Sequence, residues 1–293
     1  MAGKFFKRLG FFTAAGALFT VLESKRELRN IKKKYIRLCS DKSTKSKPVR
    51  LAFIADFHEA MEGRLNRSIT RLIENEGPDA IIIGGDMING YEDDECRPAV
   101  TLMRALSDIA PVYMAPGNHE KKAELKVYQN KELFDSFIDG ISDYDDIHYL
   151  SNEKVKLCYK DRTINIYGLD LDLEYYKRGK KVSVGKEKLN EYLGEAGDEY
   201  NILIAHNPEY FEDYAEWGAD LTLSGHFHGG LVNIPLIGGL ISPRLKVLPE
   251  YTKGLYYSKK HPDRKMYLTS GLGQHSVKVK INNIPEIIII DLI

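Results

Sequence analysis

Short apolar runs and amphipathic segments alternate along much of this chain. Between residues 50 and 115, apolar runs bounded by turn residues are separated by segments in which apolar residues recur every three or four positions. The runs predict buried strands, and the periodic segments predict helices. The expected strands are residues 50–55, 80–83 and 112–115, and the expected helices are residues 65–76 and 98–109. This β-α-β-α-β order predicts parallel strands covered by helices.

After residue 145 the pattern is dominated by strands. Apolar runs flank the polar pair Lys160-Asp161 on both sides, which predicts a hairpin. The expected strands are residues 155–159, 163–167, 202–205, 221–223, 255–257, 266–269 and 287–290. So many strands in one globule fit two sheets packed face to face with helices outside. The sequence therefore predicts an α/β fold for a domain of residues 49–293.

The first 39 residues have a different pattern, an apolar stretch between basic residues. The uncharged stretch, residues 9–22, is 14 residues long, which is shorter than the ~20 residues that usually span a bilayer. Three structures fit it: a short span over residues 5–22, an interfacial helix on anionic lipid, or a helix packed on its own domain. We favour a membrane-associated helix, with residues 1–37 contacting an anionic membrane and a polar linker at residues 40–48.

The charge distribution supports this division. The whole chain has 42 Lys and Arg and 42 Asp and Glu, yet residues 1–50 carry 14 basic against 3 acidic residues, a net of +11. The remaining residues therefore carry −11, and such an acidic globule argues against a nucleic-acid partner. If the apolar stretch spans the bilayer, the basic cluster at residues 25–37 predicts that the globule lies on the cytoplasmic side.

Five of the expected strands are followed directly by side chains that bind metals. The candidate ligands are Asp56, His58, Asp86, Asn118, His206, His226 and His228. Ligands in α/β proteins gather at the carboxyl ends of strands, so these side chains are expected to meet. Imidazole, carboxylate and amide oxygen together favour Mn, Fe, Zn or Co, and the three scattered cysteines do not form a thiolate site. The ligands are too many for one tetrahedral site and predict two divalent metal ions with a bridging carboxylate.

Taken in order, these motifs resemble those of the calcineurin-like dinuclear metallophosphoesterases. The matching motifs are Asp56-x-His58, Gly85-Asp86, Gly117-Asn-His-Glu120, His206 and Gly225-His-x-His228. The resemblance covers residues 50–290, and five motifs in order are far more specific than any single one. It is greatest for a membrane-associated bacterial branch of the family. The residues that carry this closer likeness are His206-Asn-Pro208, Gly225-His-Phe-His-Gly-Gly230 and Gly271-Leu-Gly273.

The resemblance implies a four-layer α/β/β/α sandwich of two mixed sheets, and a role for each motif residue. The implied ligands are Asp56, His58 and His228 for one ion and Asn118, His206 and His226 for the other, with Asp86 bridging both. Asp86 suits the bridge because a carboxylate can bind both ions through its two oxygens. His119 is implied to be catalytic, facing the scissile phosphate without binding metal. Manganese is the favoured ion.

The implied activity is hydrolysis of a phosphomonoester, phosphodiester or pyrophosphate by hydroxide that two metal ions generate from water. Membrane attachment would concentrate the enzyme near lipid, so the preferred substrate is a lipid-linked pyrophosphate or a nucleotide diester. The main alternative is a catalytically silent scaffold of the same fold at the membrane, although no motif residue is missing. A third is a lipid-binding anchor protein with an incidental metal.

The chain departs from the family pattern at three places. Phe227 stands where Thr is common, and Leu231 stands where Gln often follows the paired glycines. Asp86 is followed by Met-Ile-Asn instead of the Asp-Arg of the protein phosphatases, which argues against a phosphoprotein substrate. Elsewhere, Asp170 is expected in a solvated loop, with a place in the lining of the pocket as the alternative, and Tyr176 is expected to pack on a sheet or its rim.

Overall fold

The computed structural model describes most of the chain after residue 30. The described residues are 23, 26–27, 30–39, 47–58, 64–90, 95–127, 130–159, 161–177, 179, 182–230, 232–234, 238–241, 249–273 and 283–293. The apolar stretch at residues 9–22 and most of the expected linker lie outside them. Within the described residues, no helix combines the length and the hydropathy needed to cross a bilayer. The N-terminal membrane-associated helix stays a prediction.

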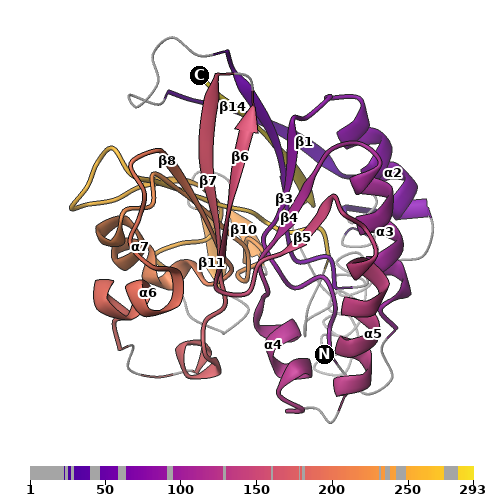
Figure 1. Ribbon diagram of the computed structural model, residues 1–293. Helices are drawn as coiled ribbons and strands as arrows, with labels where there is room; N and C mark the ends of the chain where they lie inside the picture. The colour runs from indigo at the N-terminus through magenta and orange to yellow at the C-terminus, as the bar shows by residue number, and fades with distance from the viewer. Residues whose placement is uncertain are drawn as a thin grey trace, which may run out of the picture.

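Two six-stranded sheets form the centre of the molecule (Figure 1). The first has the order β1-β14-β2-β3-β4-β5, with β1 at Lys32–Leu38, β2 at Val49–Ile54, β3 at Ala80–Ile83, β4 at Val112–Met114, β5 at Ile147–Tyr149 and β14 at Glu286–Leu292. The second has the order β12-β13-β9-β8-β7-β6, with β6 at Glu153–Tyr159, β7 at Arg162–Leu169, β8 at Tyr200–Ala205, β9 at Leu221–Ser224, β12 at Gly254–Tyr257 and β13 at Lys265–Leu268. A separate pair joins β10 (Val232–Ile234) to β11 (Gly238–Ile241).

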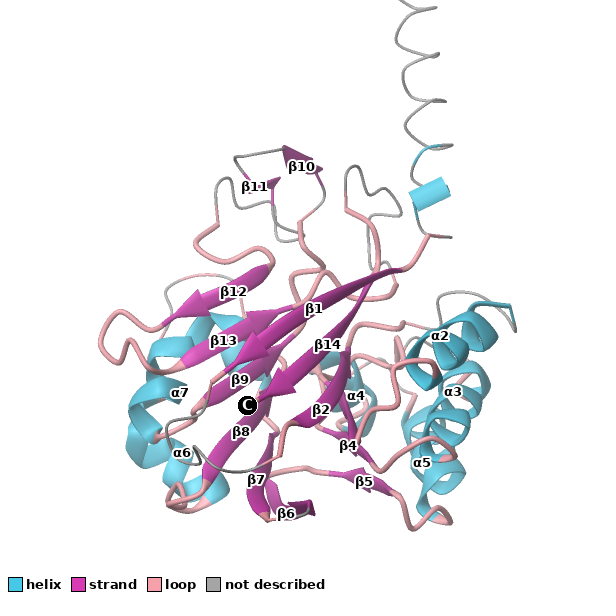
Figure 2. Ribbon diagram, turned by 90° about the horizontal axis from the view of Figure 1, so that it is seen from above, coloured by secondary structure: helices cyan, strands magenta, loops and turns pink. Residues whose placement is uncertain are grey.

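Helices cover the outer side of each sheet, as Figure 2 shows from above. The helices are α2 (Arg64–Glu74), α3 (Arg97–Ser107), α4 (Asn118–Glu124), α5 (Lys131–Ser142), α6 (Gly185–Leu193) and α7 (Phe211–Trp217), with short 3₁₀ turns η1 (Leu173–Tyr176) and η2 (Pro208–Tyr210). Ile81 and Phe137 belong to the apolar layer between the first sheet and its helices. Phe53 and Ile166 belong to the layer between the sheets, and Trp217 to the layer under α6 and α7. The expected four-layer α/β/β/α sandwich is confirmed.

Both sheets are mixed, as expected. Strands β2, β3 and β4 are parallel neighbours, which confirms the β-α-β-α-β order, whereas β14 is antiparallel to β2. In the second sheet, β7, β8 and β9 are parallel and the expected β6–β7 hairpin is antiparallel. The carboxyl ends of the parallel strands from both sheets meet at one end of the sandwich, where α/β proteins bind their ligands.

The structure corrects the domain boundary expected at residue 49. Strand β1 pairs in parallel with β14 from Lys32↔Glu286 to Leu38↔Leu292. Its basic residues concealed this role, because an edge strand exposes one side and commonly carries lysine there. Leu38 is nevertheless buried, and Ile36 packs against the layer between the sheets. The domain therefore begins at or before Lys32, and residues 32–38 belong to it instead of to the membrane-associated segment.

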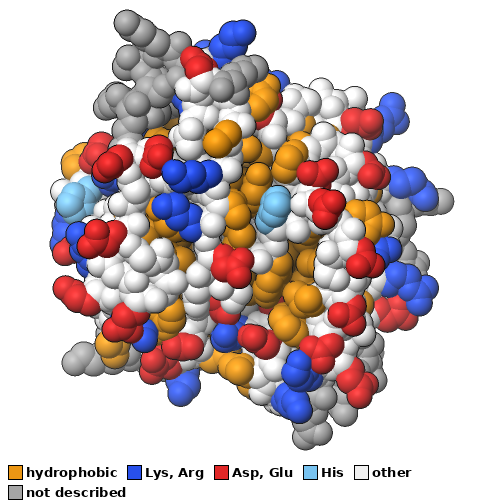
Figure 3. Space-filling model, viewed as in Figure 1, with side chains coloured by type: hydrophobic (Ala, Val, Ile, Leu, Met, Phe, Trp, Pro, Cys, Tyr) orange, Lys and Arg blue, Asp and Glu red, His pale blue; other side chains and the backbone are white. Residues whose placement is uncertain are grey.

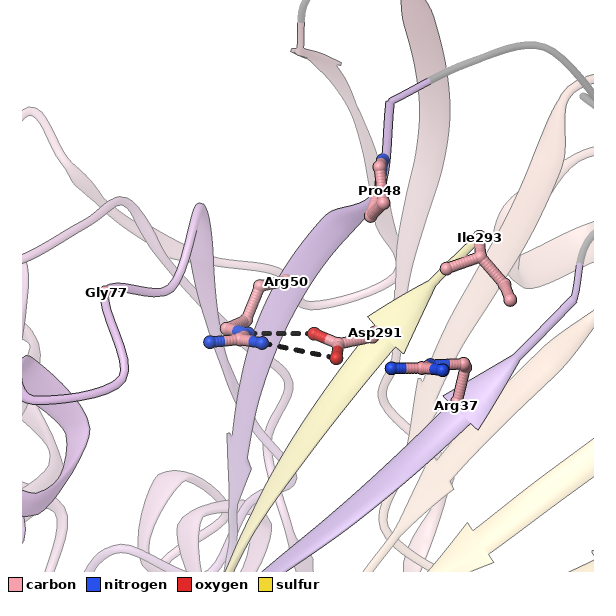
Figure 4. Close-up of a pocket in the computed structure, with 6 residues that line it drawn as sticks. All are labelled: Arg37, Pro48, Arg50, Gly77, Asp291 and Ile293. Atoms are coloured by element: carbon pink, nitrogen blue, oxygen red, sulfur yellow. Dashed lines mark hydrogen bonds and ion pairs between the residues drawn. The ribbon is translucent and has the colours of Figure 1, made fainter.

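Charged side chains pair at the end of the first sheet that lies opposite the carboxyl ends of its parallel strands (Figure 4). Arg50, at the start of β2, donates from Nε and Nη2 to the two carboxylate oxygens of Asp291 at 2.8 and 3.2 Å. Arg50 also donates from Nη1 to the carbonyl of Glu76 at 3.1 Å. A planar guanidinium matches a carboxylate in this two-bond geometry. Arg50 and Asp291 line a pocket together with Arg37. The hydrogen bonds of Arg50 there go to Asp291 and Glu76 of the protein itself.

Candidate dinuclear metal centre

Six of the seven candidate ligands bring their nitrogen or oxygen atoms together between the ends of the two sheets. Together with His119, they form three overlapping groups, each with all distances between ligand atoms within 4.8 Å: Asp56, His58 and His228; His58, Asp86 and His119; and Asp86, His206 and His226. The seventh candidate, Asn118, is the first residue of α4 and is buried. Because the groups share His58 and Asp86, they form one site.

Most of these residues have a backbone conformation that side chains disfavour. The φ angles are 53° at Asp56, 46° at His58, 53° at Asp86, 74° at His226 and 48° at His228. Each left-handed residue other than glycine costs about 1–3 kcal/mol, and such strain persists only where the surroundings enforce it. Backbone hydrogen bonds between the loop after β2 and the loop after β3 enforce this conformation. They run from Asp56 N–H to Gly85 O at 2.9 Å and from His58 N–H to Asp86 O at 3.1 Å. Strain of this kind is typical of functional sites.

Asp86 occupies the centre of the site. Its Oδ1 accepts a hydrogen bond from the backbone N–H of His119 at 2.9 Å. Its Oδ2 lies 2.9 Å from His206 Nε2 and 3.7 Å from His58 Nε2. Burial disfavours the charged carboxylate, but the surrounding imidazoles, His206 foremost, outweigh it and hold the pKa of Asp86 well below its usual value. Oδ2 thus faces the imidazoles of the site, while Oδ1 is held by the backbone of His119.

His206 is oriented by a hydrogen bond on its far side. His206 Nδ1 donates to the carbonyl of Gly84 at 2.6 Å, which directs Nε2 towards Asp86. Such a bond fixes the tautomer and is usual for metal-binding histidines. Burial lowers the pKa of His206, but Asp86 raises it to about 9. The imidazole therefore faces a site that strongly favours positive charge.

Two features of the site bear on whether cations fit it: a close pair of imidazole nitrogens and a buried amide oxygen. His58 Nε2 and His228 Nε2 lie 3.2 Å apart, with their rings stacked at 4.9 Å. Two ring nitrogens at this distance can share one proton or bind one cation. Asn118 Oδ1 is buried and has no hydrogen-bond partner among the described residues. Leaving such an oxygen unpaired costs roughly 1–3 kcal/mol, which a bound ion would offset. The donor set fits two divalent cations.

His119 lies in one group with His58 and Asp86, and its ring also has a hydrogen bond of its own. Its Nδ1 donates to the carbonyl of Asn89, and its ring packs edge-on against His58 at 5.0 Å. Nε2 is then the ring nitrogen that can serve a substrate. Burial lowers the pKa of His119, although the charge of Asp86 opposes this.

Glu120 has a supporting role that its place in the motif did not predict. This fully buried carboxylate accepts hydrogen bonds from the backbone N–H groups of Gly117 (2.9 Å), Asp86 (2.9 Å), Met87 (2.7 Å) and Ile88 (3.1 Å). It therefore joins the loop after β4 to the loop after β3 and holds Asp86 in its left-handed conformation. Gly117 is required between them, because a Cβ there would overlap the Asp86 carboxylate. The position of Glu120 three residues after Gly117, where a helix-capping glutamate is common, was the available signal.

Glu120→Gln is expected to lower both stability and activity. Its amide group would turn N–H donors towards backbone N–H donors, and each buried donor left unpaired costs about 1–3 kcal/mol in the free energy of unfolding. Because the residue supports Asp86, activity should fall roughly 10–100-fold. Urea unfolding and turnover measure the two effects. Glu124→Gln is the matched control on the same helix, since Glu124 is partly exposed and pairs only weakly with Lys121 at 3.2 Å. Equal effects of the two substitutions would contradict the assignment.

Comparison with known proteins bears on this geometry. A model of the calcineurin-like phosphoesterase family matches residues 49–230, which is more than half of the chain. The chain belongs to the calcineurin-like phosphoesterase family. It is a hydrolase that acts on phosphoric ester bonds.

Relatives of this phosphoesterase match most of its length. The metallophosphoesterase YkoQ of Bacillus subtilis is 24% identical over 244 residues, which cover 82% of each chain. The phosphodiesterase YaeI of Escherichia coli is 24% identical over 249 residues, covering 84% of this chain and 83% of that protein. The UDP-2,3-diacylglucosamine pyrophosphatase LpxG of Chlamydia trachomatis is 23% identical, covering 82% of each chain.

Two loop residues of the phosphoesterase have contacts that bear on our expectations. Tyr176, in η1, packs against the apolar layer under α6 and α7, as expected of a residue at a sheet rim, and its ring also lies edge-on to that of His226 at 5.3 Å. Asp170 is buried and pairs with Lys121 at 2.8 Å, so it is not in a solvated loop.

On the face shown in Figure 3, acidic side chains are spread over both halves of the molecule among basic ones, with an apolar strip between the halves.

Proposed function

We propose that the phosphoesterase binds two divalent cations, manganese being favoured, and hydrolyses a phosphomonoester, a phosphodiester or a pyrophosphate. The observation that carries this proposal is the convergence of imidazole and carboxylate atoms on both sides of Asp86 Oδ2. Asp56, His58 and His228 would hold one ion, and Asn118, His206 and His226 the other, with Asp86 between them. A site that mixes imidazole, carboxylate and amide oxygen suits manganese and its neighbours.

Two such ions, when bound, would supply positive charge to the phosphoryl oxygens and would lower the pKa of the attacking water. The residues of the chain provide the rest. Asn118 contributes a neutral oxygen, which limits negative charge near the phosphate. His119 Nε2 can deliver a proton to the departing oxygen or hold a phosphoryl oxygen. The ring of Tyr176 beside His226 gives the site an apolar wall.

We further infer that the substrate is a lipid-linked pyrophosphate or a nucleotide diester. The names of two relatives, a phosphodiesterase and a pyrophosphatase of a diacylated UDP-sugar, support these bond types. Asp86-Met-Ile-Asn89 also lacks the arginine of the protein phosphatases, which argues against phosphoprotein.

Metal analysis combined with a substrate panel tests the proposal. The purified full chain would be loaded with Mn²⁺, Fe²⁺, Zn²⁺ or Co²⁺ and given a nitrophenyl monoester, a nitrophenyl diester, a UDP-sugar and its diacylated form. We expect two ions per chain and turnover of a diester or a pyrophosphate, with the acylated substrate preferred. A chain that bound two ions and hydrolysed none of these substrates would favour the silent scaffold instead. A chain that bound no ions would contradict the metal centre.

We also infer that residues before β1 attach the phosphoesterase to an anionic membrane, with the globule on the cytoplasmic side. A chain beginning at Glu23 keeps β1 and should hydrolyse a soluble diester at the parent rate. Each basic residue near anionic lipid contributes about 1 kcal/mol, so losing Lys4, Lys7 and Arg8 alone should weaken vesicle partition roughly 100-fold. Sedimentation with phosphatidylglycerol vesicles at physiological salt measures this. Equal partition of both chains would contradict the attachment.

A further inference from the structure

A buried asparagine joins the loop of candidate ligands to the segment before β1. Asn283 is fully buried and lies three residues before β14. Its side-chain Nδ2 donates hydrogen bonds to the carbonyl oxygens of His228 and Gly230, the latter at 2.7 Å. Its backbone N–H donates to Glu27 Oε2 at 3.1 Å. Its Oδ1 accepts from Lys253 Nζ at 3.3 Å. Every polar group of the side chain is thus used.

The amide of Asn283 fixes the conformation of the turn that carries His228. An NH₂ group has two hydrogens, and here they meet two carbonyls of the same turn. Those carbonyls face the same donor because His228 and Gly229 are both left-handed, with φ of 48° and 68°. A Cβ on Gly229 would lie 2.5 Å from Asn283 Oδ1, so only glycine fits against the amide. The amide therefore fixes the direction from which the His228 imidazole enters the site.

Glu27 holds the other side of Asn283. Glu27 is only 2% exposed, and burying a carboxylate costs free energy unless it is hydrogen-bonded. A bond from a backbone N–H to a carboxylate is charge-assisted and about twice as strong as a neutral one. Nearer to β1, Asn30 N–H donates to Glu27 O, and Lys32 N–H donates to Pro285 O at 2.9 Å. The described residues before β1 therefore contact the segment before β14 at two places, Glu27 and Lys32.

We propose that Asn283 is a positioning residue for His228 and that Glu27 keeps Asn283 in place, so that the segment before β1 contributes to metal binding. The inference rests on the proposed metal centre. It concerns the ion assigned to Asp56, His58 and His228, and not the ion on the other side of Asp86. Groups that orient a metal ligand typically change metal affinity 10–100-fold when they are lost.

Titration of the full chain with Mn²⁺, followed by the electron paramagnetic resonance of the free ion, tests the inference. Asn283→Asp preserves shape but removes both donors, and it should weaken one of the two ions about 10–100-fold while the other changes little. Glu27→Gln and Gly229→Ala should weaken the same ion. At saturating Mn²⁺, turnover of a chromogenic diester by Glu27→Gln should return close to the parent rate. Asn66→Ala is the control, because Asn66 is also buried and donates to a carbonyl, that of Pro98 at 2.9 Å, between α2 and α3. It should lower the melting temperature without changing Mn²⁺ affinity.

The outcomes separate this inference from the metal centre itself. A parent chain that does not bind two Mn²⁺ ions would overturn the metal centre, and the inference with it. A parent that binds two ions, with unchanged affinities in Asn283→Asp and Glu27→Gln, would leave the centre standing and overturn the positioning role. Equal weakening of both ions, accompanied by a melting temperature below that of Asn66→Ala, would indicate a general loss of structure and would also overturn it.

Discussion

Asp86→Asn is expected to reduce turnover of every phosphoester substrate by at least about 10³-fold, since losing one group that stabilises developing charge already costs 10²–10³-fold. The reason lies in the two oxygens of Asp86. Oδ1 accepts the N–H of His119 at 2.9 Å, so the remaining oxygen of the asparagine would stay there. The NH₂ group would then replace Oδ2 and present hydrogens to the ions. The substitution removes a negative charge and turns a donor towards the cations.

Metal content, turnover and melting temperature distinguish this effect from unfolding. We expect less than two ions per chain and a largely intact fold. Asp79→Asn is the matched control, because Asp79 lies just before β3, at the opposite end from Asp86, and accepts a hydrogen bond from Arg50 N–H at 2.8 Å. It should bind two ions and turn over at the parent rate. If Asp86→Asn also did so, Asp86 would not be the bridge.

His119→Asn is expected to act according to the leaving group. An alkoxide leaves slowly without a proton, and general-acid assistance is typically worth ~10²–10⁴-fold, so alkyl esters should lose that much. A nitrophenolate leaves readily without a proton and should lose far less. Because His119 Nδ1 is engaged by the carbonyl of Asn89, Nε2 is the atom assigned to this transfer. Rates for a series of leaving groups, at equal metal content, give the dependence.

The control for this series is His148→Asn, since His148 lies in β5 and stacks on Tyr113 at 4.9 Å, away from the ligand cluster. It should change neither the rates nor the slope. A uniform decrease across leaving groups in His119→Asn would assign His119 to holding phosphoryl oxygens. No decrease with any leaving group would remove His119 from the mechanism.

The sequence predicted the strands of the sandwich that are short, apolar and bounded by turns. Strands β2, β3 and β9 end within a residue or so of the expected positions, and the residues after them meet as expected. Local pattern sufficed there, because a strand buried on both faces is apolar throughout. Local pattern did not predict strand β1, because an edge strand is exposed on one side and because its partner β14 lies far away in the sequence.

The supporting residues were harder to predict for a related reason. Glu120 and Asn283 bond to backbone groups of loops that are distant in sequence, and such partners leave no periodic signal. The orientation of the Asp86 carboxylate depends on a single N–H from His119, which only the folded loops bring into position. Motifs therefore indicate which side chains meet, while the atoms that they present are set by the backbone between the motifs.

The pairing of β1 with β14 has a consequence during synthesis. Both neighbours of β14, β1 and β2, leave the ribosome well before β14 does. At ~5–20 residues per second, the roughly 250 residues between β1 and β14 take tens of seconds to translate. During that time β1 cannot yet pair with β14, and it follows a basic, apolar N-terminal segment. A targeting factor or a chaperone can reach that segment and β1 on the nascent chain. Asn283 emerges just before β14, so the turn of His228 receives its amide only when that later segment has been made.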